Sequence, residues 1–228
     1  MPTTARLLPT RVPRSPAAAV IVLHGGGGRG GAVPVSPSQL SVVRMIPIAH
    51  RVVRAGRGRL AVWRLLNSTR GWGGTHTPLD DVHWALERIR AQLPPSTPIG
   101  LIGHSLGGRA AILSSGEANV RSVVALAPWL HPRDGDVDAS GCRVLFVHGP
   151  ADRVASPHRA LAAAERLSRT ARVGVIRVDH GGHAMVRRHR TFDGLAAGFT
   201  AATLLDEAPK DSCGALARIL ADVSFATI

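Results

Sequence analysis

The chain has 228 residues, of which 45% are apolar, 19% charged and 4% aromatic. This length and apolar content predict one domain over residues 1–228 with a hydrophobic core, and they exclude a disordered polyelectrolyte. The longest apolar run, Ala17–Leu23, is far shorter than the roughly 20 residues of a membrane-spanning helix. The run leads into glycines rather than a small-residue cleavage site, so we expect no membrane span, no export signal and a cytoplasmic location.

The formal net charge of +13 is concentrated at the start of the chain. Residues 1–79 contain 11 arginines and no acidic residue, so they carry +11. Such a block is compatible with an anionic partner, and this possibility stays open. However, 27 of the 28 basic residues are arginines, which indicates an arginine-rich composition throughout. Because no basic segment is interleaved with aromatic residues, we expect no nucleic-acid partner.

Strand-like and helix-like segments alternate along the chain, which is typical of βαβ units on a parallel sheet that is covered on both faces. The predicted strands are Ala18–Leu23, Leu60–Leu66, Ile99–Gly103, Val120–Leu126, Val144–His148 and Val173–Val178. The predicted helices are Ser38–Ala55 with a break at Pro47, Leu79–Gln92, Leu106–Ser115, Pro157–Thr170, Thr191–Leu205 and a short one within Cys213–Ile228. The sequence therefore predicts an α/β fold with a mostly parallel sheet of about six strands.

A G-x-S-x-G pattern, Gly103-His104-Ser105-Leu106-Gly107, follows the third predicted strand and opens a helix. A serine in such a strand–turn–helix site is exposed near the amino end of a helix, where N–H groups favour a developing negative charge. Residues without side chains are needed beside it, because the strand and the helix pass close to the turn. The pattern predicts that Ser105 is a nucleophile, although helix capping is the plainer role for such a serine.

A base and an acid follow in an order that a parallel sheet can bring together. Asp152 comes after the fifth predicted strand and His183 after the sixth. Because carboxyl ends of parallel strands meet at one edge, we expect Ser105, Asp152 and His183 to converge there. His180 is an alternative base. The alternative acids are Asp134, Asp136 and Asp138, and Asp152 could instead be a simple turn residue.

The chain order Ser…Asp…His in this context resembles the α/β-hydrolases, and in particular small serine esterases similar to dienelactone hydrolase that lack a cap domain. Three further segments resemble family motifs: the H-G-G-G loop at His24–Gly27, the acid loop at Val147–Arg153 and an R-G-x-G segment within Arg70–Gly74. The resemblance implies an oxyanion hole formed by the amides of Gly26 (or Gly27) and Leu106.

Two departures from the family pattern shape the expected site. Only 23 residues precede His24, so we expect a sheet that is shorter than in relatives or a truncated start. About thirteen residues separate Pro128 from Cys142, where relatives often insert a helical cap. The site should therefore be minimal, lidless and shallow. We expect Trp72, Trp129 and Met185 to form its apolar wall.

The resemblance implies a serine hydrolase that cleaves carboxylic esters through an acyl-enzyme, with a small-molecule substrate and no cofactor. One alternative is a thioesterase or acyltransferase whose anionic carrier is attracted by Arg109 or by the basic residues 1–79. A non-catalytic binding module is another. A peptidase is disfavoured, since such relatives usually carry an additional domain.

The sequence also bears on a dinucleotide site, a metal site and a disulfide. Gly26–Gly31 satisfies G-x-G-x-x-G, but no acidic residue follows up to Pro78 to bind a ribose, so a dinucleotide site is rejected. His180 and His183 lack a third ligand at metal-binding spacing, so we expect no metal. Two cysteines make no disulfide framework, although Cys142 and Cys213 could come close enough to pair.

Overall fold

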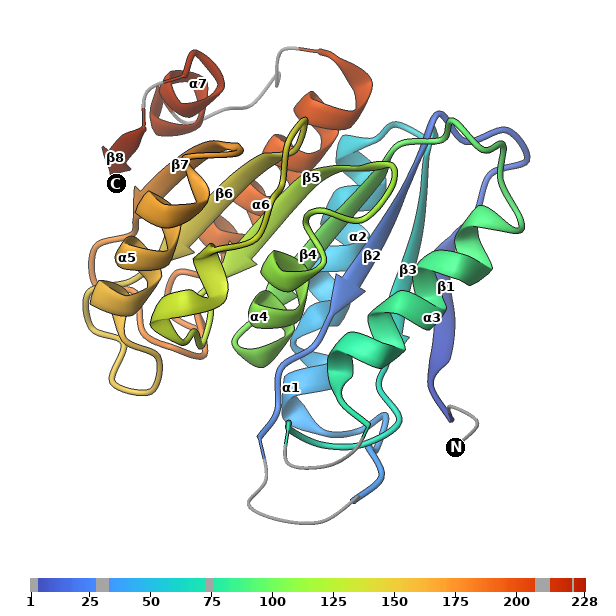
Figure 1. The fold of residues 1–228 in the computed structure, drawn as a ribbon, viewed down its shortest axis with the longest axis horizontal. Coiled ribbons are helices and arrows are strands. Elements are labelled where there is room, and N and C mark those ends of the chain that lie inside the picture. Colours follow the sequence, from blue (N-terminus) through green and yellow to red (C-terminus); the bar gives the residue numbers. More distant parts are fainter. Residues whose placement is uncertain (1–3, 28–32, 73–75, 208–213, 223) are drawn as a thin grey trace.

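A computed structural model describes residues 4–27, 33–72, 76–207, 214–222 and 224–228. The described residues form one eight-stranded sheet with helices on both faces, in the strand order β1-β3-β2-β4-β5-β6-β7-β8 (Figure 1). The strands are β1 (Arg6–Arg11), β2 (Ala18–Leu23), β3 (Leu60–Leu66), β4 (Ile99–His104), β5 (Val120–Leu126), β6 (Arg143–His148), β7 (Arg172–Arg177) and β8 (Phe225–Thr227). The helices are α1 (Leu40–Val43), α2 (Met45–Ala55), α3 (Pro78–Arg90), α4 (Leu106–Leu113), α5 (Pro157–Leu167), α6 (His189–Leu205) and α7 (Gly214–Leu220).

The sheet separates two hydrophobic cores. Helices α3, α4 and α5 pack on one face, and α2, α6 and α7 pack on the other (Figure 1). The central strands β2 and β4 are buried at every residue, because both of their faces are covered. Strands β2 to β7 run parallel to one another, so the loops that follow them all open at the same edge of the sheet.

The prediction of a mostly parallel sheet covered on both faces is confirmed, with two more strands than the six expected. Strand β1 pairs antiparallel with β3, and the short β8 pairs parallel with β7. Both lie at sheet edges, where residues are partly exposed and the apolar signal is weak. Pro9 further obscures β1, since proline is tolerated only at strand edges and bulges. The predicted terminal helix is the short α7, and β8 occupies the end of that segment.

The predicted break at Pro47 is wrong in its position. The chain divides at Arg44 into α1 and α2, and Pro47 lies in the first turn of α2. A proline is accommodated there because the first N–H groups of a helix have no intrahelical acceptor to lose.

The connection between β5 and β6 bears on access to the carboxyl edge of the sheet. It contains one short 3₁₀ helix, η1 (Pro132–Gly135), and no helical cap, as expected from its length. None of the helices within the described ranges is sufficiently long and apolar to cross a membrane.

Candidate active site

Ser105 occupies a strained turn between β4 and α4. Its backbone has φ 55° and ψ −119°, a conformation that a residue with a side chain rarely adopts. The turn is held because the Ser105 amide donates to the Leu126 carbonyl at 3.0 Å. A methyl group on Gly103 would overlap the carbonyl of Gly107, so only glycine allows β4 and α4 to approach this closely. A Cβ atom at Gly107 would lie 2.6 Å from the carbonyl oxygens of Leu23 and His24, so this glycine of the G-x-S-x-G pattern is also required by a close backbone approach.

The loop after β2 lies directly against this turn. A Cβ atom at Gly25 would be 3.0 Å from the Cβ of Ser105, and one at Gly27 would be 3.6 Å from Cδ1 of Leu106. Gly26, between them, has φ +124°, which favours glycine. The buried His24 ring positions the loop: its Nδ1–H donates to the Gly25 carbonyl at 2.6 Å, and its Nε2 accepts from the Asn67 amide at 3.1 Å.

The structure brings together the three side chains that the sequence singled out. Nε2 of His183 lies 3.0 Å from Oγ of Ser105, and Nδ1 of His183 lies 2.9 Å from Oδ2 of Asp152. A carboxylate only accepts hydrogen bonds, so Nδ1 carries the hydrogen and Nε2 is left free to accept from the serine hydroxyl. We call this set of three residues the relay. Its members come from the turns after β4, β6 and β7.

The Asp152 carboxylate accepts from four donors. Oδ2 accepts from His183 and from Nε2 of His148 at 3.0 Å, while Oδ1 accepts from the amides of Val154 and Ala155 at 2.8 and 2.9 Å. Burial alone would raise the pKa of the Asp152 carboxyl, but these hydrogen bonds outweigh it and hold the pKa well below its ordinary value. Asp152 therefore stays ionised and fixed in orientation beside His183.

His148 is a functional neighbour that the sequence reasoning missed. It ends β6, is buried, and faces two acceptors, Asp152 and the Ala155 carbonyl at 3.0 and 3.2 Å. Its Nε2 must therefore carry a hydrogen. The four-residue spacing from Asp152 could have signalled the contact, but a turn rather than a helix creates it.

His104 supports the loop that carries His183. Its Nε2–H donates to the His183 carbonyl at 2.8 Å, and the two rings lie with centroids 5.0 Å apart. The same loop is held from α2's amino end, where Nε of Arg44 donates to the Ala184 carbonyl at 3.3 Å. Burial lowers the pKa of His104 to about 4, partly opposed by the bond to the His183 carbonyl. His104 is thus neutral at physiological pH.

This buried imidazole predicts a measurable pH dependence of stability. Its folded pKa of about 4 lies below the unfolded value of about 6.5, so the unfolded chain binds more protons between these values. The stabilising contribution is complete above pH 6.5 and is lost as the pH falls towards 4. We expect His104→Gln to reduce the slope of unfolding free energy against pH by about 1 kcal/mol per pH unit in this window.

Urea unfolding of wild type and variant at a series of pH values measures this slope. His158→Gln is the matched control, because His158 is exposed on α5. Equal slopes for wild type and His104→Gln would show that His104 is not held neutral by the fold.

The alternative base and the alternative acids that the sequence offered lie outside the relay. His180 is exposed in a left-handed turn, and no relay hydrogen bond described above involves it. Each alternative acid has its own partner: Asp134 pairs with Arg109, Asp136 with Arg166, and Asp138 accepts from Ser140. Arg109 is engaged twice, since it bonds Asp134 at 2.8 and 3.2 Å and lies 4.3 Å from the centre of the Trp72 ring.

The three candidates for an apolar wall have different surroundings. Trp129 is half-buried, donates its amide to the Ser105 carbonyl at 3.1 Å, and lines a groove of about 430 Å³ beside Asp152. Trp72 packs against the core and is covered by Arg109. Met185 is 1% exposed within the core on the α6 side of the sheet, so its side chain offers a substrate almost no surface.

Some predictions fall partly or wholly on residues beyond the described ranges. These are Gly28–Gly31 of the glycine run, Gly73 and Gly74 of the R-G-x-G segment, and Cys213. Cys142 is a buried free thiol, and burial raises its pKa to about 12. Within the described ranges, no group of three or more metal-ligating side chains gathers at one point.

Comparison with known proteins identifies the fold. No family model matches the sequence, and the curated proteins give no significant match. Among solved structures, the chain is similar to Est1E from Butyrivibrio proteoclasticus with ferulic acid bound (16% identity, 89% of this chain and 96% of that chain, TM-score 0.65). It is also similar to the esterase domain of a Rhodothermus marinus protein (16%, 90% and 100%, TM-score 0.61).

A third similar structure is XC6422 from Xanthomonas campestris, described as an α/β serine hydrolase without a lid (20% identity, 89% of this chain and 95% of that chain, TM-score 0.59). At these identities the likeness is one of fold, and it extends over nearly the full length of each structure. The sheet order, the covering helices and the uncapped connection after β5 agree with it. The chain therefore has the α/β-hydrolase fold, in a form without a lid.

Proposed function

We propose that this protein is a serine hydrolase that cleaves carboxylic esters through an acyl-enzyme intermediate. The observation that carries the proposal is the continuous series of hydrogen bonds from Oγ of Ser105 through His183 to Asp152, at 3.0 and 2.9 Å. A serine hydroxyl is a weak nucleophile at neutral pH, and a neighbouring imidazole oriented by a carboxylate activates it. The esterase and serine-hydrolase neighbours on the same fold support this assignment.

In the first half-reaction, Oγ of Ser105 attacks the ester carbonyl while Nε2 of His183 takes its proton. Asp152 keeps the imidazole in the required tautomer and stabilises the imidazolium that forms. The protonated His183 then donates to the leaving alcohol, and the acyl group remains on Ser105. In the second half-reaction, water attacks the acyl-enzyme while His183 takes a proton from it. His183 then returns the proton to Oγ of Ser105 as the bond to the acyl group breaks, which releases the carboxylic acid.

The amides of Gly26 and Leu106 are the proposed oxyanion hole. Leu106 is the first residue of α4, and the first N–H groups of a helix have no intrahelical acceptor. The Gly25–Gly27 loop lies against Ser105 and Leu106, and the amide of Gly26 in this loop is the proposed second donor. Two N–H donors there would stabilise the negative charge of the tetrahedral intermediate. The proposed reaction needs no cofactor, because its difficult step is this charge stabilisation.

Pre-steady-state hydrolysis of a nitrophenyl ester tests the proposal. An acyl-enzyme whose hydrolysis is the slower step releases one equivalent of nitrophenol per chain in a rapid burst before steady turnover. Covalent acyl transfer can be checked in parallel by the mass increase of the quenched protein. A protein that neither hydrolyses nitrophenyl esters of graded chain length nor gains acyl mass would contradict the proposal and favour a binding module on this fold.

A further inference from the structure

A groove adjoins the relay on the side of Asp152. It encloses about 430 Å³, and its walls come from the segment after β5 and from the β6–α5 turn with the start of α5. The residues that line it include Trp129, Asp152, Arg153 and Arg159. The wall at Trp129 is joined to the serine turn, because the Trp129 amide donates to the Ser105 carbonyl at 3.1 Å. The groove therefore shares Trp129 and Asp152 with the surroundings of the candidate active site.

The groove carries an uncompensated positive charge. Arg153 and Arg159 are exposed, and neither has an ion pair with a described residue. Asp152 is the one acid among the lining residues, but its side chain is buried and both oxygens are occupied by histidine and amide donors. Its charge is therefore directed away from the groove and into the relay.

The segment after His183 adds charge of the same sign. Residues 186–190 are all exposed, and the arginines among them are Arg187, Arg188 and Arg190. Like Arg153 and Arg159, these three arginines form no ion pair with a described residue. The edge of the sheet that carries the relay is thus positively charged on two of its loops, which attracts anions.

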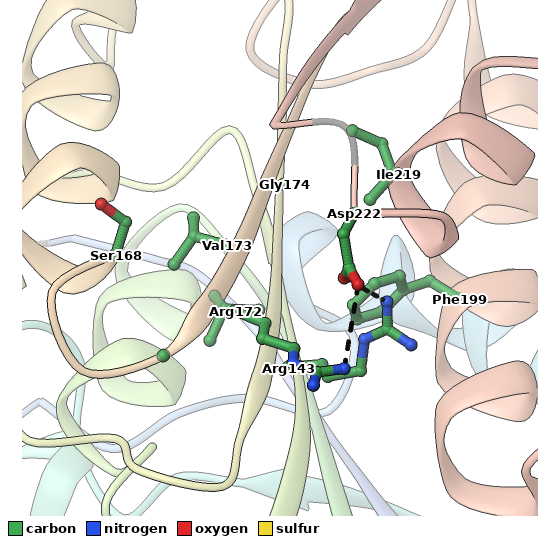
Figure 2. Close-up of a pocket in the computed structure, with 10 residues that line it drawn as sticks. Arg143, Ser168, Arg172, Val173, Gly174, Phe199, Ile219 and Asp222 are labelled. Carbon is green, nitrogen blue, oxygen red and sulfur yellow. Dashed lines mark hydrogen bonds and ion pairs between the residues drawn. The ribbon is translucent and has the colours of Figure 1, made fainter.

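A second pocket lies at the opposite edge of the sheet, and its arginines form ion pairs. Figure 2 shows this pocket of about 250 Å³, in which Arg143 and Arg172 both point to Asp222, at 3.1 and 3.9 Å. Arg143 also donates to the Leu220 carbonyl at 2.9 Å and so ties the end of α7 to the sheet. These arginines stabilise the fold, whereas Arg153 and Arg159 in the groove beside Asp152 have no ion-pair partner among the described residues.

We propose that the groove is a subsite for an anionic group, so that the preferred esters carry a carboxylate or similar anion in their acyl part, bound by Arg153 and Arg159. This inference rests on the proposed function and deepens it. Arginine binds carboxylates through paired N–H donors, and Trp129 adds an aromatic residue to the groove lining, which suits the carbon chain of such an acyl group. The acyl part is assigned because Trp129, which lines the groove, is hydrogen-bonded through its backbone amide to Ser105, the residue that would hold the acyl group in the intermediate.

Two esters of equal chain length test the subsite. Nitrophenyl hexanoate and the mono-nitrophenyl ester of adipic acid have the same leaving group and acyl chains of six carbons. The hexanoate ester is neutral, whereas the adipate ester ends in a carboxylate. We expect wild type to have the higher kcat/KM for the adipate ester at low salt, and high salt to reduce that preference. In the double variant Arg153→Gln/Arg159→Gln, the ratio of the two kcat/KM values should fall by about tenfold, mainly through KM of the adipate ester.

Arg169→Gln is the matched control, because Arg169 is exposed at the opposite edge of the sheet and should leave the ratio unchanged. Arg159→Gln alone, away from the Asp152 turn, repeats the test if the double variant does not fold. A wild type that prefers hexanoate, or a ratio that the groove variants do not lower, would overturn the subsite while leaving the proposed function standing. Hydrolysis of neither ester would overturn both.

Discussion

Replacing Ser105 by alanine should lower kcat for a nitrophenyl ester by at least about a thousandfold, the scale of loss when a relay member of this kind is removed. The change deletes the one atom, Oγ, that lies 3.0 Å from Nε2 of His183. It leaves the remaining two residues and the proposed amide donors in place, so KM should change little. Steady-state kinetics of the purified variant, with the concentration of folded protein set by circular dichroism, measures the effect.

Ser168→Ala is the matched control for this change. Ser168 is exposed at the end of α5, towards the opposite edge of the sheet, so its loss should not alter turnover. If Ser105→Ala retained wild-type kcat in a folded protein, Ser105 would not be the nucleophile, and the strained turn would need another explanation.

Asp152→Asn should reduce kcat by on the order of ten-thousandfold, because asparagine cannot take the place of this carboxylate. Asp152 accepts from four donors, two ring N–H groups and two backbone amides. An asparagine side chain has one oxygen acceptor, and its NH₂ group would face other donors in either orientation. His183 would then lose the partner that keeps its hydrogen on Nδ1, and Nε2 would no longer be available as the base.

Asp134→Asn separates this effect from a general loss of acidic residues near the site. Asp134 pairs with Arg109 and contributes nothing to the relay, so the variant should keep turnover within a few-fold of wild type. Rates of both variants should be compared below their melting temperatures, since leaving buried donors unpaired also lowers stability. If both variants lost turnover to a comparable extent, the result would contradict the assignment of Asp152 as the residue that orients His183.

The sequence was sufficient to predict the central part of the fold. Strands β2, β3 and β5 have the predicted bounds, because strands buried on both faces are near-continuous apolar runs. The edge strands β1 and β8 were not predicted. Their residues are partly exposed, and β8 has three residues that become a strand only by pairing with β7. The pairing of an edge strand depends on contacts with the neighbouring strand, and the local sequence of the edge strand does not specify those contacts.

The same distinction applies to the candidate site. The predicted positions of Ser105, Asp152 and His183 follow from topology, since each lies in the turn or loop after a parallel strand. The support from His148 and His104 depends on ring orientation and on how two loops fold back, and no periodic pattern carries that information. Whether an arginine forms an ion pair cannot be predicted from the sequence either. Arg109 pairs with Asp134, whereas Arg153 and Arg159 line an open groove.

Labelling with a fluorophosphonate probe tests most directly whether Ser105 is an activated nucleophile, because such probes react covalently with serines that a neighbouring base activates. Peptide mass spectrometry of the labelled protein should find one probe per chain, on Ser105, with labelling strongly slowed in His183→Gln. The absence of labelling in folded protein, labelling of another serine, or the same labelling rate in His183→Gln would contradict the account.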